Sequence, residues 1–317
     1  MDRRTIQDYR VMMADRVRMA AYQQAIASVC PGKVVCEIGV GLAPLSLMAL
    51  EAGATRVYGI EISAETLAVA VQIMADNGYG PDRFVPIEGL STRAELPERV
   101  DVLLSETLDS MGIGENTAMY MADARARFMA PDACFLPAAL DCSVALASPA
   151  AYRDDISFWA DEMPEVYGMR YGVAAEQFKN CKHTISVAAD ELLSEWEMWQ
   201  SIDFLDDTTY RRVVPLMLPV TRAGEILGFA CAFDARLCDG VHIRTFPQDT
   251  PTHWNQGFNA FPQPIQAALG DVVYMELDIA KEDRPALRFE MRVVSGAAAE
   301  IAEFVRQRAA AFAQGAT

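Results

Sequence analysis

A glycine-rich turn and an acidic residue are the first features in the chain that could perform chemistry. The turn is Gly39-Val40-Gly41, which directly follows the apolar run 34–38, and Glu61 closes the next apolar run. Glycines at a strand-to-helix turn expose backbone N–H groups and let a ligand approach the main chain closely. A carboxylate at the end of the second strand can accept hydrogen bonds from both hydroxyls of a ribose. These residues predict a site for a nucleoside-containing ligand, although Glu61 could instead cap the next helix.

Three kinds of ligand fit such a turn to different degrees. A phosphate cradle requires a Gly-Lys-Ser or Gly-Lys-Thr triplet after the turn, and the sequence has none there. A dinucleotide site favours a third glycine, where this chain has Ala43-Pro44. An adenosyl sulfonium needs only close approach of the backbone. We therefore expect S-adenosyl-L-methionine as the cofactor and S-adenosyl-L-homocysteine as its product.

The elements that must position this turn alternate between helices and short apolar strands. Strands are expected at 34–38, 56–62, 84–87 and 100–104, and helices at 11–30, 44–51 and 64–76. This alternation is typical of a parallel sheet wrapped by helices. After about Pro137 strand-like alternation dominates, at 212–217, 226–230, 271–277 and 287–293, with helix-like segments at 151–162 and 190–196 and a final helix at 297–317. An antiparallel β domain is therefore expected after residue 137.

Composition excludes several classes of protein. The 317 residues carry a net charge of −17 and no basic run, which argues against nucleic acid and anionic membranes as partners. The seven cysteines are odd in number and form no Cys-x-x-Cys pair, so we expect reduced thiols and neither a disulfide framework nor a metal site. No signal peptide and no apolar run of about 18 residues is present. We expect a cytoplasmic protein.

The segment after the fourth expected strand carries two glutamates, Glu106 and Glu115, in the sequence Ser-Glu-Thr-Leu-Asp-Ser-Met-Gly-Ile-Gly-Glu. It resembles the double-glutamate loop of the protein arginine methyltransferase family. Three other stretches agree with that family in order and spacing. Residues 12–18 resemble the helix that closes over the cofactor, 35–61 resemble motif I with its following acid, and Pro-Thr-His-Trp-Asn-Gln at 251–256 resembles the Thr-His-Trp loop.

The resemblance implies an α/β fold, in which a Rossmann-like S-adenosylmethionine-dependent methyltransferase domain is followed by a β-barrel domain with an inserted helical dimerisation arm. We expect a cofactor-covering helix at 1–30, the Rossmann-like domain at 31–137 and the barrel at 138–317, with the arm at about 151–180. In the family this arm packs on a second subunit, so the resemblance implies a homodimer.

The resemblance also implies a chemistry for the two glutamates. A guanidinium is planar, stays protonated at neutral pH and delocalises its charge, so its nitrogens are poor nucleophiles. Glu106 and Glu115 would pair with its N–H groups and direct one terminal nitrogen at the cofactor's methyl group. By their match to the family, the other expected site residues are His253 and Asp15 for catalysis, Arg18, Gly39, Gly41, Glu61, Ser91 and Thr92 for the cofactor, and Met12 and Trp254 for the substrate.

Departures from the family pattern refine the expected activity. Within the loop, Leu108-Asp109-Ser110 and Ile113-Gly114-Glu115 resemble the type III, monomethylating members, so we expect one methyl addition. The aromatic helix that precedes the cofactor helix in many members is expected to be missing, because the sequence begins eight residues before Tyr9.

The sequence indicates the acceptor molecule less clearly than it indicates the reaction. No tandem domain or peptide-docking tail is apparent, so we expect free L-arginine, as in bacterial specialised metabolism. Arginine within a protein is the alternative. An alternative of another class is a non-catalytic partner that keeps the methyltransferase fold.

Overall fold

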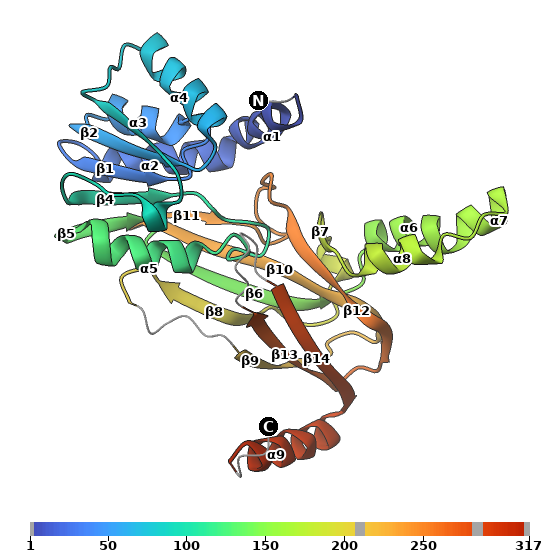
Figure 1. Cartoon of the computed structure of the whole chain (residues 1–317). Coiled ribbons are helices and arrows are strands. Elements are labelled where there is room, and N and C mark those ends of the chain that lie inside the picture. Colours follow the sequence, from blue (N-terminus) through green and yellow to red (C-terminus); the bar gives the residue numbers. More distant parts are fainter. Residues whose placement is uncertain (1–2, 207–212, 281–287, 314–317) are drawn as a thin grey trace.

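The first half of the chain forms a parallel five-stranded sheet with helices around it (Figure 1). The computed structural model describes residues 3–206, 213–280 and 288–313. The strands are β1 (Val34–Ile38), β2 (Arg56–Glu61), β3 (Phe84–Glu88), β4 (Val100–Ser105) and β5 (Met129–Leu136). The helices are α1 (Arg3–Ala14), α2 (Arg16–Val29), α3 (Pro44–Glu51), α4 (Ala64–Asp76) and α5 (Thr117–Phe128), with the 3-10 turn η1 (Ser91–Arg93).

The strand order β3-β2-β1-β4-β5 places a switch in direction between β1 and β4. Ligands of open parallel sheets bind at the carboxyl ends of the strands beside such a switch. Gly39 follows β1, Glu61 ends β2 and Glu106 follows β4. Residues far apart in the sequence therefore meet at one edge of the sheet.

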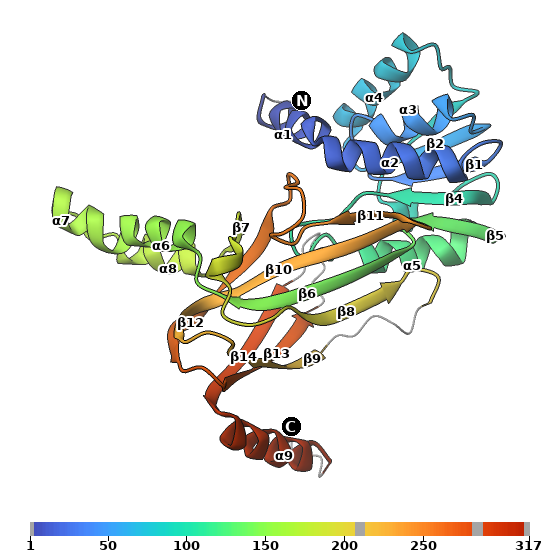
Figure 2. The ribbon, with the colours of Figure 1, turned by 180° about the vertical axis from the view of Figure 1, so that it is seen from behind.

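The second half is antiparallel (Figure 2). One sheet has the order β7-β12-β10-β6-β8, with β11 paired to β10, and the other has the order β14-β13-β9. The first sheet comprises β6 (Ala139–Ala147), β7 (Lys182–Ile185), β8 (Glu197–Asp203), β10 (Gly224–Cys238), β11 (Val241–Arg244) and β12 (Gln256–Ala267). The second comprises β9 (Val213–Pro219), β13 (Asp271–Ala280) and β14 (Arg288–Ala297), against which α9 (Ala298–Ala313) packs.

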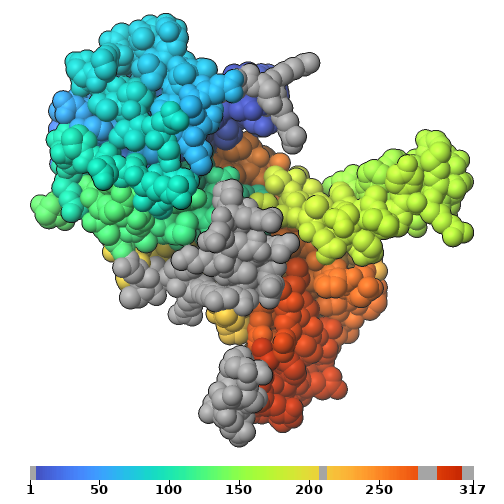
Figure 3. Space-filling model, viewed as in Figure 1, coloured from blue at the N-terminus to red at the C-terminus, as the bar shows by residue number. Residues whose placement is uncertain are grey.

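A helical arm lies between β6 and β7 and extends away from both sheets (Figures 1 and 3). It consists of α6 (Ala150–Ser157), the π-helical turn η2 (Phe158–Glu162), α7 (Met163–Tyr167), α8 (Gly172–Lys179) and their connections. Within the described residues, none of the helices combines the length and apolar character needed to cross a membrane.

Most expected elements are present, and the predicted fold class is confirmed. Two expectations were wrong. The helix expected at 11–30 is divided at Asp15, whose extended backbone ends α1 and whose side chain caps α2 by accepting a hydrogen bond from Arg18 N. Residues 190–196 form no α-helix. They comprise the end of the 3-10 turn η3 (Ala189–Glu191) and the segment that leads into β8. Parts of three expected elements, at 212, 287 and 314–317, lie outside the described residues.

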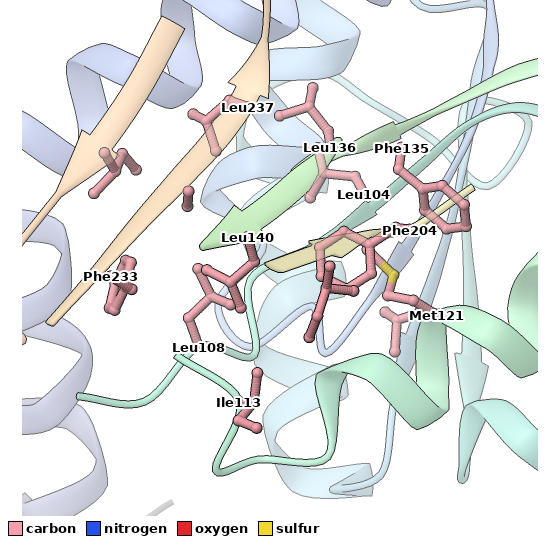
Figure 4. Packing of buried hydrophobic residues seen from close by; sticks show 14 of the residues in the cluster. Leu104, Leu108, Ile113, Met121, Phe135, Leu136, Leu140, Phe204, Phe233 and Leu237 are labelled. Atoms are coloured by element: carbon pink, nitrogen blue, oxygen red, sulfur yellow. The ribbon is translucent and has the colours of Figure 1, made fainter. Parts of the chain in front are cut away.

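The loop after β4 is anchored in the core where the two halves of the chain meet (Figure 4). Leu108 and Ile113 are 4% and 1% exposed, and they belong to the same hydrophobic cluster as Leu104 of β4 and Leu140 of β6. Burying two such side chains stabilises the loop by about 1.5–3 kcal/mol for each. The loop that carries Glu106 and Glu115 is therefore held in place by packing.

Candidate active site

A cavity of about 440 Å³ opens at the carboxyl edge of the parallel sheet. Its walls come from α1, α2, the turn after β1, the end of β2, the loop after β4, β7 and the segment before β12. The predicted site residues that line it are Met12, Arg18, Gly39, Gly41, Glu61, Glu106, Glu115, His253 and Trp254. Residues from both halves of the chain thus share one cavity.

The glycine turn forms one wall of this cavity. Gly39 and Gly41 have φ angles of 76° and 55°, in the left-handed region that favours glycine. Glu61 accepts hydrogen bonds from Gly41 N at 3.0 Å and Ser63 N at 2.9 Å. A Cβ on Gly41 would lie 2.7 Å from the ring of Tyr9. Tyr9 lies on α1, the helix that precedes α2.

Arg18 and Glu106 form a buried ion pair beside the turn. Arg18 Nε donates to Glu106 Oε2 at 3.0 Å and Nη2 donates to the same oxygen, with the two side chains 6% and 8% exposed. The other oxygen, Oε1, has a long bond of 3.4 Å from Leu108 N. Glu106 is thus fixed in orientation, while one of its oxygens remains weakly bonded.

Glu115 is electrostatically different from Glu106. The surrounding protein raises the pKa of its carboxyl to about 7, mainly by burial and then through the negative charges of Glu106 and Asp109, while Lys182 acts in the opposite direction. The residue as a whole is nevertheless exposed to the solvent of the open cavity. Among the described residues it accepts no hydrogen bond, so its ionised form lacks the kind of partner that Glu106 has in Arg18.

Asp109 organises the turn between the two glutamates. Its Oδ1 accepts hydrogen bonds from Met111 N at 3.0 Å and Gly114 N at 2.9 Å, and its Oδ2 forms an ion pair with Lys182 of β7. A Cβ on Gly114 would lie 1.8 Å from Oδ2. Trp254 Nε1 donates to Leu108 O at 2.7 Å and closes the other side of the loop. The loop is therefore bonded to the antiparallel half through Lys182 and Trp254, and further through Thr184 and Gly257, which both donate to Ser110.

Asp15 and His253 join α2 to the segment before β12. Asp15 Oδ2 lies 2.9 Å from His253 Nδ1 and accepts the His253 backbone N–H at 2.8 Å. Burial opposes ionisation of Asp15, but the hydrogen bonds from His253 and from Arg18 N outweigh it and lower the pKa of this carboxyl. The predicted pair is therefore in contact, with His253 at the cavity and Asp15 behind it.

Three predicted residues, Asp15, Ser91 and Thr92, do not line this cavity, and several residues that line it were not predicted. Ser91 and Thr92 lie in η1 after β3, outside its lining. Tyr9 and Lys182 line the cavity, yet neither was identified as a site residue from the sequence. Tyr9 could have been found, since it precedes the motif at 12–18 by three residues. Lys182 stands in a short polar strand without a recognisable motif. Within the described ranges, no three His, Cys, Asp or Glu side chains group as a metal site would require.

Comparison with known proteins agrees with this geometry. The sequence profile of the arginine methyltransferase oligomerization subdomain matches residues 142–293. A probable histone-arginine methyltransferase 1.3 of Arabidopsis thaliana is 28% identical over 282 residues, covering 83% of this chain and 51% of that protein. A probable protein arginine N-methyltransferase 6.1 of Oryza sativa subsp. indica is 25% identical over 319 residues, covering 87% and 81%. The chain spans about half the length of the first of these relatives.

Solved structures show the same fold. The Trypanosoma brucei PRMT1 enzyme–prozyme heterotetrameric complex with AdoHcy contains a chain that superposes with a TM-score of 0.77 at 22% identity, covering 92% of this chain and 93% of that one. Arabidopsis thaliana protein arginine methyltransferase 10 gives 0.74 at 23% identity over the same shares.

Proposed function

We infer that this chain is a member of the protein arginine methyltransferase family and that it transfers a methyl group from S-adenosyl-L-methionine to a terminal guanidino nitrogen of arginine; the match to the oligomerization subdomain and the curated relatives support this. One observation carries this proposal. Glu106, held by Arg18, and Glu115, which has no such partner, line the same cavity as the Gly39–Gly41 turn. A cavity with one compensated and one uncompensated carboxylate suits a planar cation that can bond to both.

The residues present fit this cofactor. The cavity of about 440 Å³ lies within the range that encloses small ligands, and side chains larger than glycine at position 41 would intrude on its wall. We propose that Gly39 and Gly41 border the methionyl part, Glu61 binds the ribose, Arg18 binds the carboxylate, and the segment of Ser91 and Thr92 contacts the adenine. When bound, the sulfonium supplies an electrophilic methyl group.

The two glutamates would perform complementary tasks on the acceptor. Glu106 is preorganised by Arg18, so its orientation need not change when the acceptor binds. Glu115 gains the positive partner that it lacks, which favours its ionised form. Together they would localise the guanidinium charge away from one terminal nitrogen and orient that nitrogen towards the cofactor. Positioning of this kind can contribute about 7–11 kcal/mol to lowering the barrier of a transfer reaction.

The remaining site residues would act through position. Asp15 holds His253 at the cavity, where the imidazole could accept the proton that the methylated guanidinium releases. Trp254 is fixed by its bond to Leu108 O and would pack against the acceptor, with Met12 from α1 opposite the loop.

We propose a single methyl addition, with free L-arginine of bacterial specialised metabolism as the acceptor. The loop residues that resemble type III members support the first part, and the charge of Lys182, argued below, supports the second. Arginine in a protein is the second candidate, supported by the names of the curated relatives, which are histone- and protein-arginine methyltransferases.

The test is incubation with methyl-labelled S-adenosylmethionine and either L-arginine or an Arg-Gly-rich peptide, followed by mass spectrometry of the product. The proposal expects label in arginine as a monomethyl species. Glu106→Gln and Glu115→Gln should each lower turnover far more than cofactor affinity. A dimethyl product would refute the single addition, and absence of label from both acceptors would refute the transferase.

We further propose a cytoplasmic homodimer, with units at 1–30, 31–137 and 138–317. The arm supports the assembly, since it exposes apolar side chains at Phe158, Val166, Tyr167, Met169, Tyr171 and Val173. Light scattering of the Val166→Asp variant, with the exposed Val213→Asp as a matched control, would test this surface.

The non-catalytic alternative predicts no label transfer even if calorimetry detects S-adenosylmethionine binding.

A further inference from the structure

Lys182 is a positively charged residue in the wall of the cavity. It opens β7, whose residues alternate between two environments as strand geometry requires. Lys182 and Thr184 line the cavity, whereas His183 and Ile185 pack into the cluster around Tyr152. In the pairing of β7 with β12, Lys182 lies opposite Asn259, and this register determines which face of the sheet the Lys182 side chain occupies. Its direction into the cavity is therefore set by the sheet.

The Lys182 ammonium is held but not saturated. Its Nζ pairs with Asp109 Oδ2, and the side chain is 38% exposed whereas that of Asp109 is 8% exposed. An ammonium has three N–H donors, so donors remain for a second acceptor on the open side. Asp109 is also bonded by two backbone N–H groups, so its negative charge is shared among three donors.

The positive charges in the cavity wall differ in what they contact. Among the described lining residues, the permanent positive charges belong to Arg18 and Lys182. Arg18 is bonded to Glu106, at the cofactor side. Lys182 is near enough to Glu115 to lower the pKa of that carboxyl. A guanidinium bonded to both glutamates would thus have the Lys182–Asp109 ion pair near it, and the ammonium donors that Asp109 leaves unused favour an acceptor that also carries an anion.

A free guanidino acid satisfies that condition, whereas an internal arginine of a basic peptide does not. In free arginine a short aliphatic chain joins the guanidinium to a carboxylate, whereas arginine within a peptide carries a neutral amide in its place. Neighbouring Lys or Arg residues in a basic peptide would also meet a like charge at Lys182, which disfavours binding. The cavity thus offers Glu106 and Glu115 to the guanidinium, and the N–H donors of Lys182 that Asp109 leaves unused to a carboxylate of the same acceptor.

We propose that Lys182 binds the carboxylate of a free guanidino acid and thereby selects free arginine over arginine in proteins. This inference rests on the proposed methyl transfer to a guanidinium. Lys182 would be a specificity-determining residue, while Asp109 orients its ammonium from behind.

The test compares L-arginine with agmatine, which is arginine without the carboxylate, as acceptors of labelled methyl groups. The wild-type protein should prefer arginine in kcat/KM by about 10- to 100-fold, the range expected for one charge-assisted hydrogen bond. Lys182→Met should remove most of this preference, mainly through the KM for arginine, and Lys182→Arg should retain it. Lys179→Met is the matched control, because Lys179 pairs with Glu176 on the arm, and it should leave the preference intact.

The outcomes separate this inference from the proposed function. Equal use of arginine and agmatine by the wild-type protein would overturn it without any variant. An equal fall for both acceptors in Lys182→Met would also overturn it, since that result shows a role in loop structure alone. A preference for an Arg-Gly-rich peptide over arginine would overturn the role of Lys182 and leave methyl transfer standing. Methylation of no guanidino compound would refute the proposed function itself.

Discussion

Acidification should reduce acceptor capture through a single group, Glu115. Its carboxyl has a pKa of about 7, raised by burial and then by Glu106 and Asp109, and only its ionised form can pair with a guanidinium, which itself stays protonated. A group with this pKa is about one-tenth ionised at pH 6 and about nine-tenths ionised at pH 8. We therefore expect kcat/KM for the acceptor to rise about tenfold between these pH values.

The assay is the initial rate of label transfer from saturating S-adenosylmethionine at low acceptor concentration, from pH 5.5 to 9 at constant ionic strength. Lys182→Met provides an internal check, because Lys182 lowers the pKa of Glu115 and its removal should move the midpoint to higher pH. A profile that is flat over this range, or a midpoint that moves downward in the variant, would refute the reasoning.

Three further changes test separate parts of the site. Gly114→Ala should lower kcat about 100-fold with cofactor affinity retained, because its Cβ would lie 1.8 Å from Asp109 Oδ2 and displace the loop; near-normal turnover would contradict this. Asp15→Ala removes the α2 cap and the bond to His253 and should lower the free energy of unfolding in urea by about 1–2 kcal/mol; an unchanged midpoint would count against it. Glu61→Gln should raise the Kd for S-adenosylmethionine about tenfold by calorimetry, and unaltered binding would exclude the ribose role.

Local patterns predicted most of the parallel half of the fold, although α5 and β5 were missed. The runs at 34–38 and 56–62 are short, apolar and followed by turn or cap residues, so sequence and structure agree there within a residue. The division at Asp15 was missed because apolar residues continue at helical spacing on both sides of it. The cause of the break is instead a tertiary contact, since the carboxylate that caps α2 also holds His253.

The antiparallel half was predicted less completely. Only 226–230 was identified within β10, which extends from Gly224 to Cys238. Residues 231–238 were missed, although 234–238 alternate between buried and half-buried positions. The path of such a strand depends on its pairing with β6 and β12, which are distant in the sequence.

Contacts between residues distant in the sequence were also the part of the site that could not be predicted. The motifs predicted that Arg18, Glu106 and Glu115 would lie together, and the cavity contains all three. They did not predict that Arg18 would pair with Glu106 directly. Lys182 approaches Asp109 across 73 positions of sequence, through the register of β7, and no local pattern reports that contact.

The most direct test of the account is a crystal structure with S-adenosylhomocysteine and the acceptor bound. The account predicts a guanidinium bonded to both Glu106 and Glu115, with one terminal nitrogen facing the sulfur of the cofactor product. A guanidinium bound elsewhere, or a Glu115 carboxylate directed away from it, would contradict the central claim that these two side chains hold the acceptor for methylation.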